Sequence, residues 1–168
     1  NYADTFHTYY HPGIYYIELS ATNYCKTETY YDTVTIFPLP NVSFYAASKC
    51  LNDTTVFITD VFASDTSSYT LSCGITIPVP AGGTPISYQW SMIENVDGSY
   101  VNGTTKDSLN AQFVFNGCGL KTVSLTVFDE NNCDSTYTNT IIIHELPIPI
   151  FSVNICVTFM LLLRGALL

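Results

Sequence analysis

The chain has 168 residues, of which 47% are hydrophobic, 14% aromatic and only 11% charged. This composition excludes the usual disordered chain, which is poor in aromatic residues and rich in charge. Five basic residues against 14 acidic ones give a net charge of −9. A surface of that sign repels phosphate backbones and anionic lipids, so nucleic-acid binding is disfavoured.

Alternation of residues with a period of two predicts β-strands along the chain. The first such run places Tyr15, Ile17, Leu19 and Ala21 on one face. The same pattern returns in the later run with Val123, Leu125 and Val127. Segments rich in β-branched and aromatic residues, which favour strands, are Thr29–Ile36, Thr54–Val61, Ile86–Met92, Ala111–Phe115 and Thr136–Ile143. Gly- and Asn-containing turns separate these segments and no long helix is indicated, so the sequence predicts an all-β fold.

An internal repeat divides the chain. From Gly13 the sequence reads GIYYIELSATNYC, then a Thr-rich strand, then LPNVSF. From Gly119 it reads GLKTVSLTVFDENNC, then another Thr-rich strand, then LPIPIF. The offsets are 106, 108 and 107 residues for the matched pairs Gly13/Gly119, Cys25/Cys133 and Pro40/Pro147. A period of this length suits a self-contained β-sandwich of about 100 residues rather than a solenoid unit.

We therefore expect three parts. Residues 1–39 supply the C-terminal strands of a truncated repeat, residues 40–146 form a complete sandwich, and residues 147–168 open a third repeat. The Leu-Pro pairs at 39–40 and 146–147 mark the joints, because proline ends strand pairing and stiffens a short connection. The correspondence fails past Cys156, so an off-pattern tail is expected from residue 157. Its apolar run is shorter than the ~20 residues of a membrane span.

The anchors of the first copy are His7, Tyr9, Gly13, Tyr15, Ile17, Leu19 and Asn23. Those of the second copy are Gly119, Val123, Leu125, Val127 and Asp129, with Tyr88-Gln89-Trp90 upstream. This spacing resembles the PKD (polycystic kidney disease) domain family, in the form found in tandem arrays of bacterial surface proteins. The resemblance implies an immunoglobulin-like β-sandwich in tandem repeats. It also implies a role as a spacer or adhesive stalk, or as an accessory module beside a secreted hydrolase.

Three features depart from the family pattern. The usual W-D-F-G-D-G turn is replaced by Trp90-Ser91-Met92-Ile93-Glu94. Lys121 stands where the first copy has Tyr15, so a tyrosine-corner hydrogen bond is expected to be lost there. Residues 62–85, which include Cys73, are interpreted as an insertion between the second and third strands.

The aromatic residues suggest different roles. Trp90, the only tryptophan, is expected in the core between the two sheets rather than on a sugar-binding surface. The pairs Tyr9-Tyr10, Tyr15-Tyr16 and Tyr30-Tyr31 each place one ring on the solvent face of a strand. Exposed tyrosine is common in recognition surfaces, although it is also common in secreted β-proteins.

Six cysteines without a C-x-x-C motif favour an oxidising compartment, and hence an extracellular or cell-surface location. In the immunoglobulin-like order that the resemblance implies, Cys50 and Cys118 share one pole, and Cys73 and Cys133 the other. The expected disulfides are therefore Cys50–Cys118 and Cys73–Cys133, with Cys50–Cys133 and inter-domain pairs as alternatives.

No catalytic residues are predicted, because the three histidines form no H-E-x-x-H motif and no G-x-S-x-G motif exists. Two loose acidic clusters, Glu94–Gly98 and Asp129–Asn132, contain oxygen ligands suited to calcium. Neither has a recognised calcium-loop spacing, so solvated loops are preferred and no cofactor is expected. The sequence thus favours a non-catalytic structural or adhesive spacer. Its expected partners are neighbouring repeats and surface polysaccharide or protein ligands. No membrane span is expected in this segment. The alternative is a polymer-binding accessory module of an extracellular hydrolase.

Overall fold

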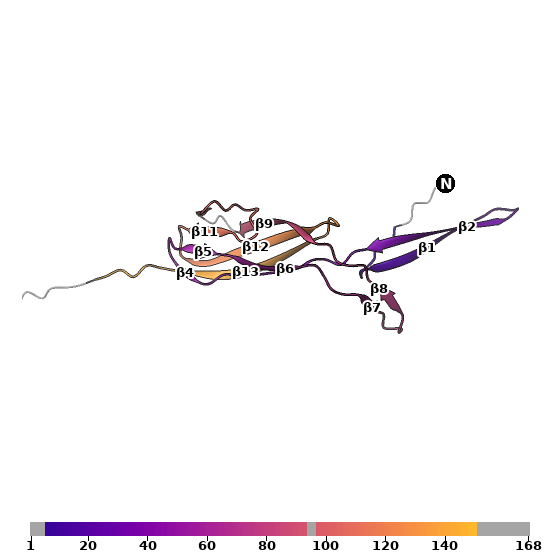
Figure 1. Cartoon of the computed structure of the whole chain (residues 1–168), viewed down its shortest axis with the longest axis horizontal. Coiled ribbons are helices and arrows are strands. Elements are labelled where there is room, and N and C mark those ends of the chain that lie inside the picture. Colours follow the sequence, from indigo (N-terminus) through magenta and orange to yellow (C-terminus); the bar gives the residue numbers. More distant parts are fainter. Residues whose placement is uncertain (1–5, 94–96, 151–168) are drawn as a thin grey trace, which may run out of the picture.

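The computed structural model describes residues 6–93 and 97–150, and within these ranges every regular element is a strand. The all-β prediction is confirmed. Figure 1 shows an elongated molecule with a β-sandwich in the middle and a long two-stranded hairpin at one end. Residues 145–150 run away from the other end of the sandwich without regular structure.

The first layer of the sandwich is a four-stranded sheet with the order β4-β13-β12-β9. Its members are β4 (Lys49–Cys50), β9 (Pro85–Ile93), β12 (Gly119–Asp129) and β13 (Asp134–His144). Strands β12 and β13 form an antiparallel hairpin, β9 pairs with the free edge of β12, and β4 runs parallel to the end of β13. The predicted strands at residues 86–92 and 136–143 lie within β9 and β13.

The second layer is built from shorter strands. These are β3 (Asn41–Tyr45), β5 (Thr54–Val56), β6 (Ile58–Phe62), β10 (Gly98–Tyr100) and β11 (Gln112–Phe115). Strand β11 lies between β10 and β5, and β3 pairs with β6. The N–H of Phe57, the single residue between β5 and β6, donates to the carbonyl of Ala111 at 2.9 Å, which extends the pairing of β5 with the β11 segment. The predicted strand at residues 54–61 is therefore interrupted only at Phe57.

The two layers enclose one aromatic core. Val123, Leu125 and Val127 point inward from β12 and are completely buried, as their alternation requires. Trp90 is 2% exposed, and its ring centroid lies 5.0 Å from those of Phe44 and Phe57. The remaining buried members of the core are Ala111, Phe113, Phe115, Ile141 and Ile143, and Tyr88 packs against them half-buried. This layered, antiparallel arrangement, with β4 parallel to β13, is the expected immunoglobulin-like sandwich.

A separate two-stranded sheet precedes the sandwich. It consists of β1 (Gly13–Thr22) and β2 (Thr27–Ile36), paired from Gly13↔Ile36 to Thr22↔Thr27. The β12–β13 hairpin pairs in the same way, from Gly119↔Ile143 to Phe128↔Asp134. The first turn contains residues 23–26 and the second residues 129–133, so the second is one residue longer. This difference accounts for the rise in offset between the two copies from 106 to 107 residues.

The segment between β6 and β9 forms its own small hairpin. Strands β7 (Ser68–Thr70) and β8 (Thr76–Pro78) pair only with each other and project from the sandwich beside β1 (Figure 1). This hairpin occupies the segment that was expected to be an insertion. We call it the insertion hairpin.

Candidate functional site: the joint between hairpin and sandwich

Residues 37–40 connect β2 to β3 without regular structure. Pro38 and Pro40 are buried, whereas Phe37 before them and Leu39 between them remain exposed. Each proline ring fixes φ near −65°, which reduces the number of conformations open to the connection. The buried prolines therefore restrict bending at the joint between the hairpin and the sandwich.

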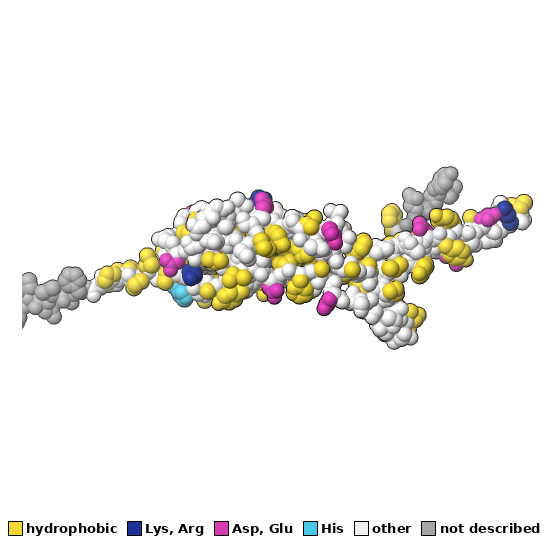
Figure 2. Space-filling model, in the orientation of Figure 1, with side chains coloured by type: hydrophobic (Ala, Val, Ile, Leu, Met, Phe, Trp, Pro, Cys, Tyr) yellow, Lys and Arg dark blue, Asp and Glu magenta, His cyan; other side chains and the backbone are white. Residues whose placement is uncertain are grey.

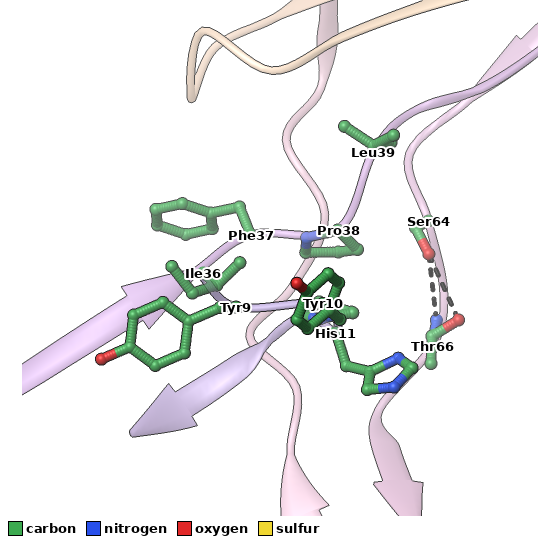
Figure 3. A pocket seen from close by; sticks show the side chains of 10 residues that line it. Tyr9, Tyr10, His11, Ile36, Phe37, Pro38, Leu39, Ser64 and Thr66 are labelled. Carbon is green, nitrogen blue, oxygen red and sulfur yellow. Dashed lines mark hydrogen bonds between the residues drawn. The ribbon is translucent and has the colours of Figure 1, made fainter. Parts of the chain in front are cut away.

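A groove of about 420 Å³ runs along this connection (Figure 3). It is lined by Tyr9, Tyr10, His11, Pro12, Ile36, Phe37, Pro38, Leu39, Ser64 and Thr66. The lining thus comes from three parts of the chain: the segment before β1, the connection after β2, and the segment leading into the insertion hairpin. Figure 2 shows hydrophobic side chains at the surface of this end of the molecule.

A tyrosine corner holds the start of β1. The hydroxyl of Tyr15 donates to the carbonyl oxygen of His11 at 2.9 Å, and the Tyr15 ring lies 4.5 Å from that of Tyr9. A tyrosine bonding to the backbone a few residues upstream is a feature of immunoglobulin-like strand corners. Lys121 occupies the equivalent position in β12 and has no phenol hydroxyl, so this bond has no counterpart there.

The insertion hairpin packs against the same corner. The rings of His11 and Tyr69 are stacked, with centroids 3.9 Å apart and planes inclined by 19°. Gly13 is buried against β8, and a Cβ atom built on Gly13 would lie 2.5 Å from Cγ2 of Ile77. Only a residue without a side chain allows β1 and β8 to approach this closely.

The other leg of the insertion is attached to the turn between β12 and β13. The carboxylate Oε1 of Glu130 accepts from the N–H of Thr84 at 3.2 Å and from its hydroxyl at 3.4 Å. The N–H of Glu130 donates to the carbonyl of Thr84 at 3.1 Å. A Cβ atom on Gly83 would lie 2.5 Å from Oδ2 of Asp129, so glycine is required there too. Residues 63–84 thus touch both the hairpin and the sandwich.

Asp129 organises this turn. It is completely buried, and its Oδ1 accepts from the N–H groups of Asn131 at 2.9 Å and Cys133 at 2.8 Å. Its Oδ2 is buried without a hydrogen-bond partner. In the β1–β2 turn, the neutral side chain of Asn23 accepts from two N–H groups in the same manner. The turn geometry therefore does not require a charge at this position.

The acidic clusters do not converge in the part of the chain that the structure describes. Within those residues, no group of three or more His, Cys, Asp or Glu side chains could hold a metal ion. Residues 94–96 of the first cluster lie outside the described ranges, as does the tail from residue 151 that was assigned to a third repeat.

The five described cysteines are all free thiols. Cys50 pairs with His144 across β4 and β13, while Cys118 directly precedes β12 on the opposite side of β13. Both lie at one end of the sheet, and a bridge between them would have to cross β13. Cys73 lies in the turn of the insertion hairpin and Cys133 in the β12–β13 turn. The two expected disulfides stay predictions.

Cys133 differs from an ordinary exposed thiol. Burial raises the pKa of the Cys133 thiol, and the carboxylates of Asp129 and Asp134 raise it further by disfavouring a neighbouring negative charge.

The pKa of the Tyr100 phenol, in the sandwich, is also raised. Burial is the main cause, and the Asp107 carboxylate makes a smaller contribution.

The equivalent residues of the two hairpins differ sharply in burial. Leu125 is 0% exposed, but Leu19, its counterpart in the first copy, is 70% exposed. Each faces a tyrosine across its hairpin, Tyr30 for Leu19 and Tyr137 for Leu125. In the described residues no strand pairs with the other edge of β1 and no second layer covers its face. Tyr15, at the joint, is half-buried. Gly119, the counterpart of the buried Gly13, is exposed and has a positive φ of 95°.

The tyrosine pairs follow the alternation in two of three cases. Tyr10 and Tyr16 are each 84% exposed, while Tyr9 and Tyr15 are half-buried. Both members of the third pair, Tyr30 and Tyr31, are exposed. The reason is the same open face that exposes Leu19.

No family model matches this chain, and no curated protein matches it. It is similar in structure to the PKD1 domain of Vibrio anguillarum Epp, with 19% identity over 66% of this chain and 99% of that domain and a TM-score of 0.44. The PKD domain from KIAA 1837 protein is 20% identical over 66% of this chain and 92% of that domain, with a TM-score of 0.39. A nucleoside hydrolase-related hypothetical protein from Saccharophagus degradans, associated with carbohydrate metabolism, is 14% identical over 67% of this chain and 26% of that protein, with a TM-score of 0.39. Residues 6–93 and 97–150 contain no helix that is long and apolar enough to cross a membrane.

Proposed function

We propose that this chain is a non-catalytic spacer segment of a secreted or cell-surface protein built from PKD-like repeats. Residues 1–39 are the C-terminal part of one repeat, residues 40–146 a complete repeat, and residues 147–168 the beginning of the next. The partners of each repeat are its neighbours in the same polypeptide.

The observation that carries this proposal is the pairwise equivalence of the two hairpins. They share their register, their opposed Leu–Tyr pair and a turn capped by an Asn or Asp side chain. One of them has its complete aromatic core, whereas the apolar face of the other is open. A hairpin that repeats the register of the β12–β13 hairpin is best explained as the corresponding hairpin of a second sandwich.

The joint supports a mechanical role. Two buried prolines limit rotation of the connection, and the insertion hairpin bridges the two parts. The net charge of −9 keeps such an array soluble, and many weak contacts along it would add up to firm attachment.

Two measurements test the spacer role. The first is recovery of the full reading frame, which is expected to contain further repeats and an anchoring signal. The second is single-molecule stretching of the chain between handles, which is expected to show one main unfolding event for the sandwich at residues 40–146. A catalytic domain on the same polypeptide, or unfolding of the whole chain in one step including the hairpin, would contradict the proposal.

The exposed tyrosines favour a second candidate, a polymer-binding accessory module of an extracellular hydrolase. Tyr16 and Tyr31 stand on the outer faces of β1 and β2, and Tyr24 is fully exposed at their turn. Aromatic rings in such positions suit stacking on sugar rings. Pull-down on chitin, cellulose and collagen distinguishes the candidates. Selective retention that Tyr16→Ala and Tyr24→Ala abolish would favour the module, whereas equal, low retention of all variants favours the spacer.

A further inference from the structure

We propose that the insertion hairpin is an interdomain docking element, which recognises the C-terminal hairpin of the preceding PKD-like repeat. This inference rests on the proposed function, since it takes β1–β2 to be the end of such a repeat. The docking surface on the β1–β2 side is formed by His11, Gly13 and Tyr15. The contact surface on the insertion hairpin is formed by Tyr69 and Ile77.

The contacts are of the kind that distinguishes one surface from another. Stacking of Tyr69 on His11 needs a flat ring at residue 11, held in place by the hydrogen bond from Tyr15 to the His11 carbonyl. Packing of Ile77 on Gly13 needs the absence of a side chain at residue 13. The protruding ring of His11 and the bare backbone of Gly13, two residues apart, thus form a surface that Tyr69 and Ile77 fit.

The insertion hairpin can hold one orientation for docking, because its base is fixed to the sandwich. Thr84 shares three hydrogen bonds with Glu130, and Gly83 packs on the buried Asp129. At the other leg, Ser64 lies against Gly82, where a Cβ atom would meet the Ser64 nitrogen at 2.6 Å. The two legs of the insertion therefore lie against each other at its base.

The corresponding surface at the end of the sandwich is different. At an offset of 106, the positions of His11, Gly13 and Tyr15 are taken by Gly117, Gly119 and Lys121. Gly117 has no ring on which a tyrosine could stack, and Lys121 provides no hydroxyl for the corner. The insertion hairpin is therefore specific for a repeat ending such as residues 9–15, and the end of the sandwich does not carry that surface.

The test measures the orientation of the two hairpins in the full chain. Nitroxide labels are placed on Cys25 and Cys73, which lie exposed in the two hairpin turns, with the other four cysteines changed to serine. A narrow distribution of label distances is expected, which broadens in both Tyr69→Ala and His11→Gly. Tyr31→Ala, which removes an exposed tyrosine from β2, is the matched control and is expected to leave it narrow.

Hydrogen exchange on the protein with its natural cysteines provides a second readout. Amides of the insertion hairpin are expected to exchange about threefold to tenfold faster in Tyr69→Ala, the effect of losing one aromatic pair. Trp90 fluorescence verifies that the sandwich stays folded in every variant. A broad distribution in the parent, or distances and exchange unaffected by Tyr69→Ala and His11→Gly, would overturn the docking role. Neither result bears on the reading-frame test, so failure of the docking and failure of the spacer proposal are distinguishable.

Discussion

Leu19 and Leu125 occupy equivalent positions in the two hairpins, and truncating each of them to alanine measures what covers each hairpin. Leu125 is completely buried against the aromatic core, so Leu125→Ala is expected to destabilise the sandwich by about 3 kcal/mol. Leu19 is 70% exposed, so Leu19→Ala is expected to change stability by no more than about 0.5 kcal/mol. The two variants make the same chemical change in the same local register.

Urea unfolding followed by two probes provides the assay. Trp90 fluorescence reports on the sandwich alone, and far-ultraviolet circular dichroism reports on all strands. With a urea slope of about 2 kcal/mol per molar, Leu125→Ala shifts the midpoint by about 1.5 M. An equal shift of the dichroism midpoint in Leu19→Ala would refute the reasoning, because it would mean that the face of β1 is covered within this chain.

Four further predictions concern the sandwich and its turns. Gly83→Ala places a Cβ atom against Asp129 and is expected to cost about 1–3 kcal/mol in urea unfolding, whereas Gly117→Ala, whose Cβ would meet only the Lys121 side chain at 3.4 Å, is the control with little cost. Trp90→Phe removes the bond from Nε1 to the Ser108 carbonyl, 2.8 Å long, and is expected to cost about 1–3 kcal/mol; a stability equal to that of the parent would show that this bond is not formed. The melting temperature is expected to be the same in calcium and in chelator, because two backbone N–H groups already occupy Oδ1 of Asp129; a calcium-dependent rise that Asp129→Ala abolishes would establish a cation site instead. Because its raised pKa leaves less thiolate at a given pH, Cys133 is expected to react with a thiol reagent more slowly than the exposed Cys73, with the gap narrowing as the pH rises; faster labelling of Cys133 in mass-spectrometric mapping would contradict this.

The local features of this fold are readable from sequence because they depend on neighbouring residues. The alternation around Leu125 sets which side chains of β12 face inward, and Gly13 and Gly119 mark where each hairpin begins. The tyrosine corner at Tyr15 follows from a single side chain and the backbone four residues before it. The insertion was recognisable because residues 62–85 have no place in the order of sandwich strands.

The tertiary features were not predictable in the same way. Leu19 has the sequence environment of Leu125, and only the absence of covering strands in the described residues makes it exposed. The stack of His11 on Tyr69 joins residues 58 positions apart, and no periodicity links them. The sequence marked Asp129 as an anchor of the second copy and as part of an acidic cluster, but not as a buried residue that accepts backbone hydrogen bonds and packs on Gly83. Each of these depends on which surfaces meet, which a one-dimensional pattern does not contain.

Hydrogen exchange at β1 and β12 tests the central claim most directly, that the two hairpins are equivalent parts of two sandwiches. In the present chain, β12 amides are expected to be protected to the level of global unfolding, whereas β1, paired on one edge only, exchanges by local opening. In a polypeptide extended upstream by the preceding repeat, β1 is expected to reach the protection of β12. If β1 remains as unprotected in the extended polypeptide while the added region is folded, the hairpin is not part of a second sandwich and the account is wrong.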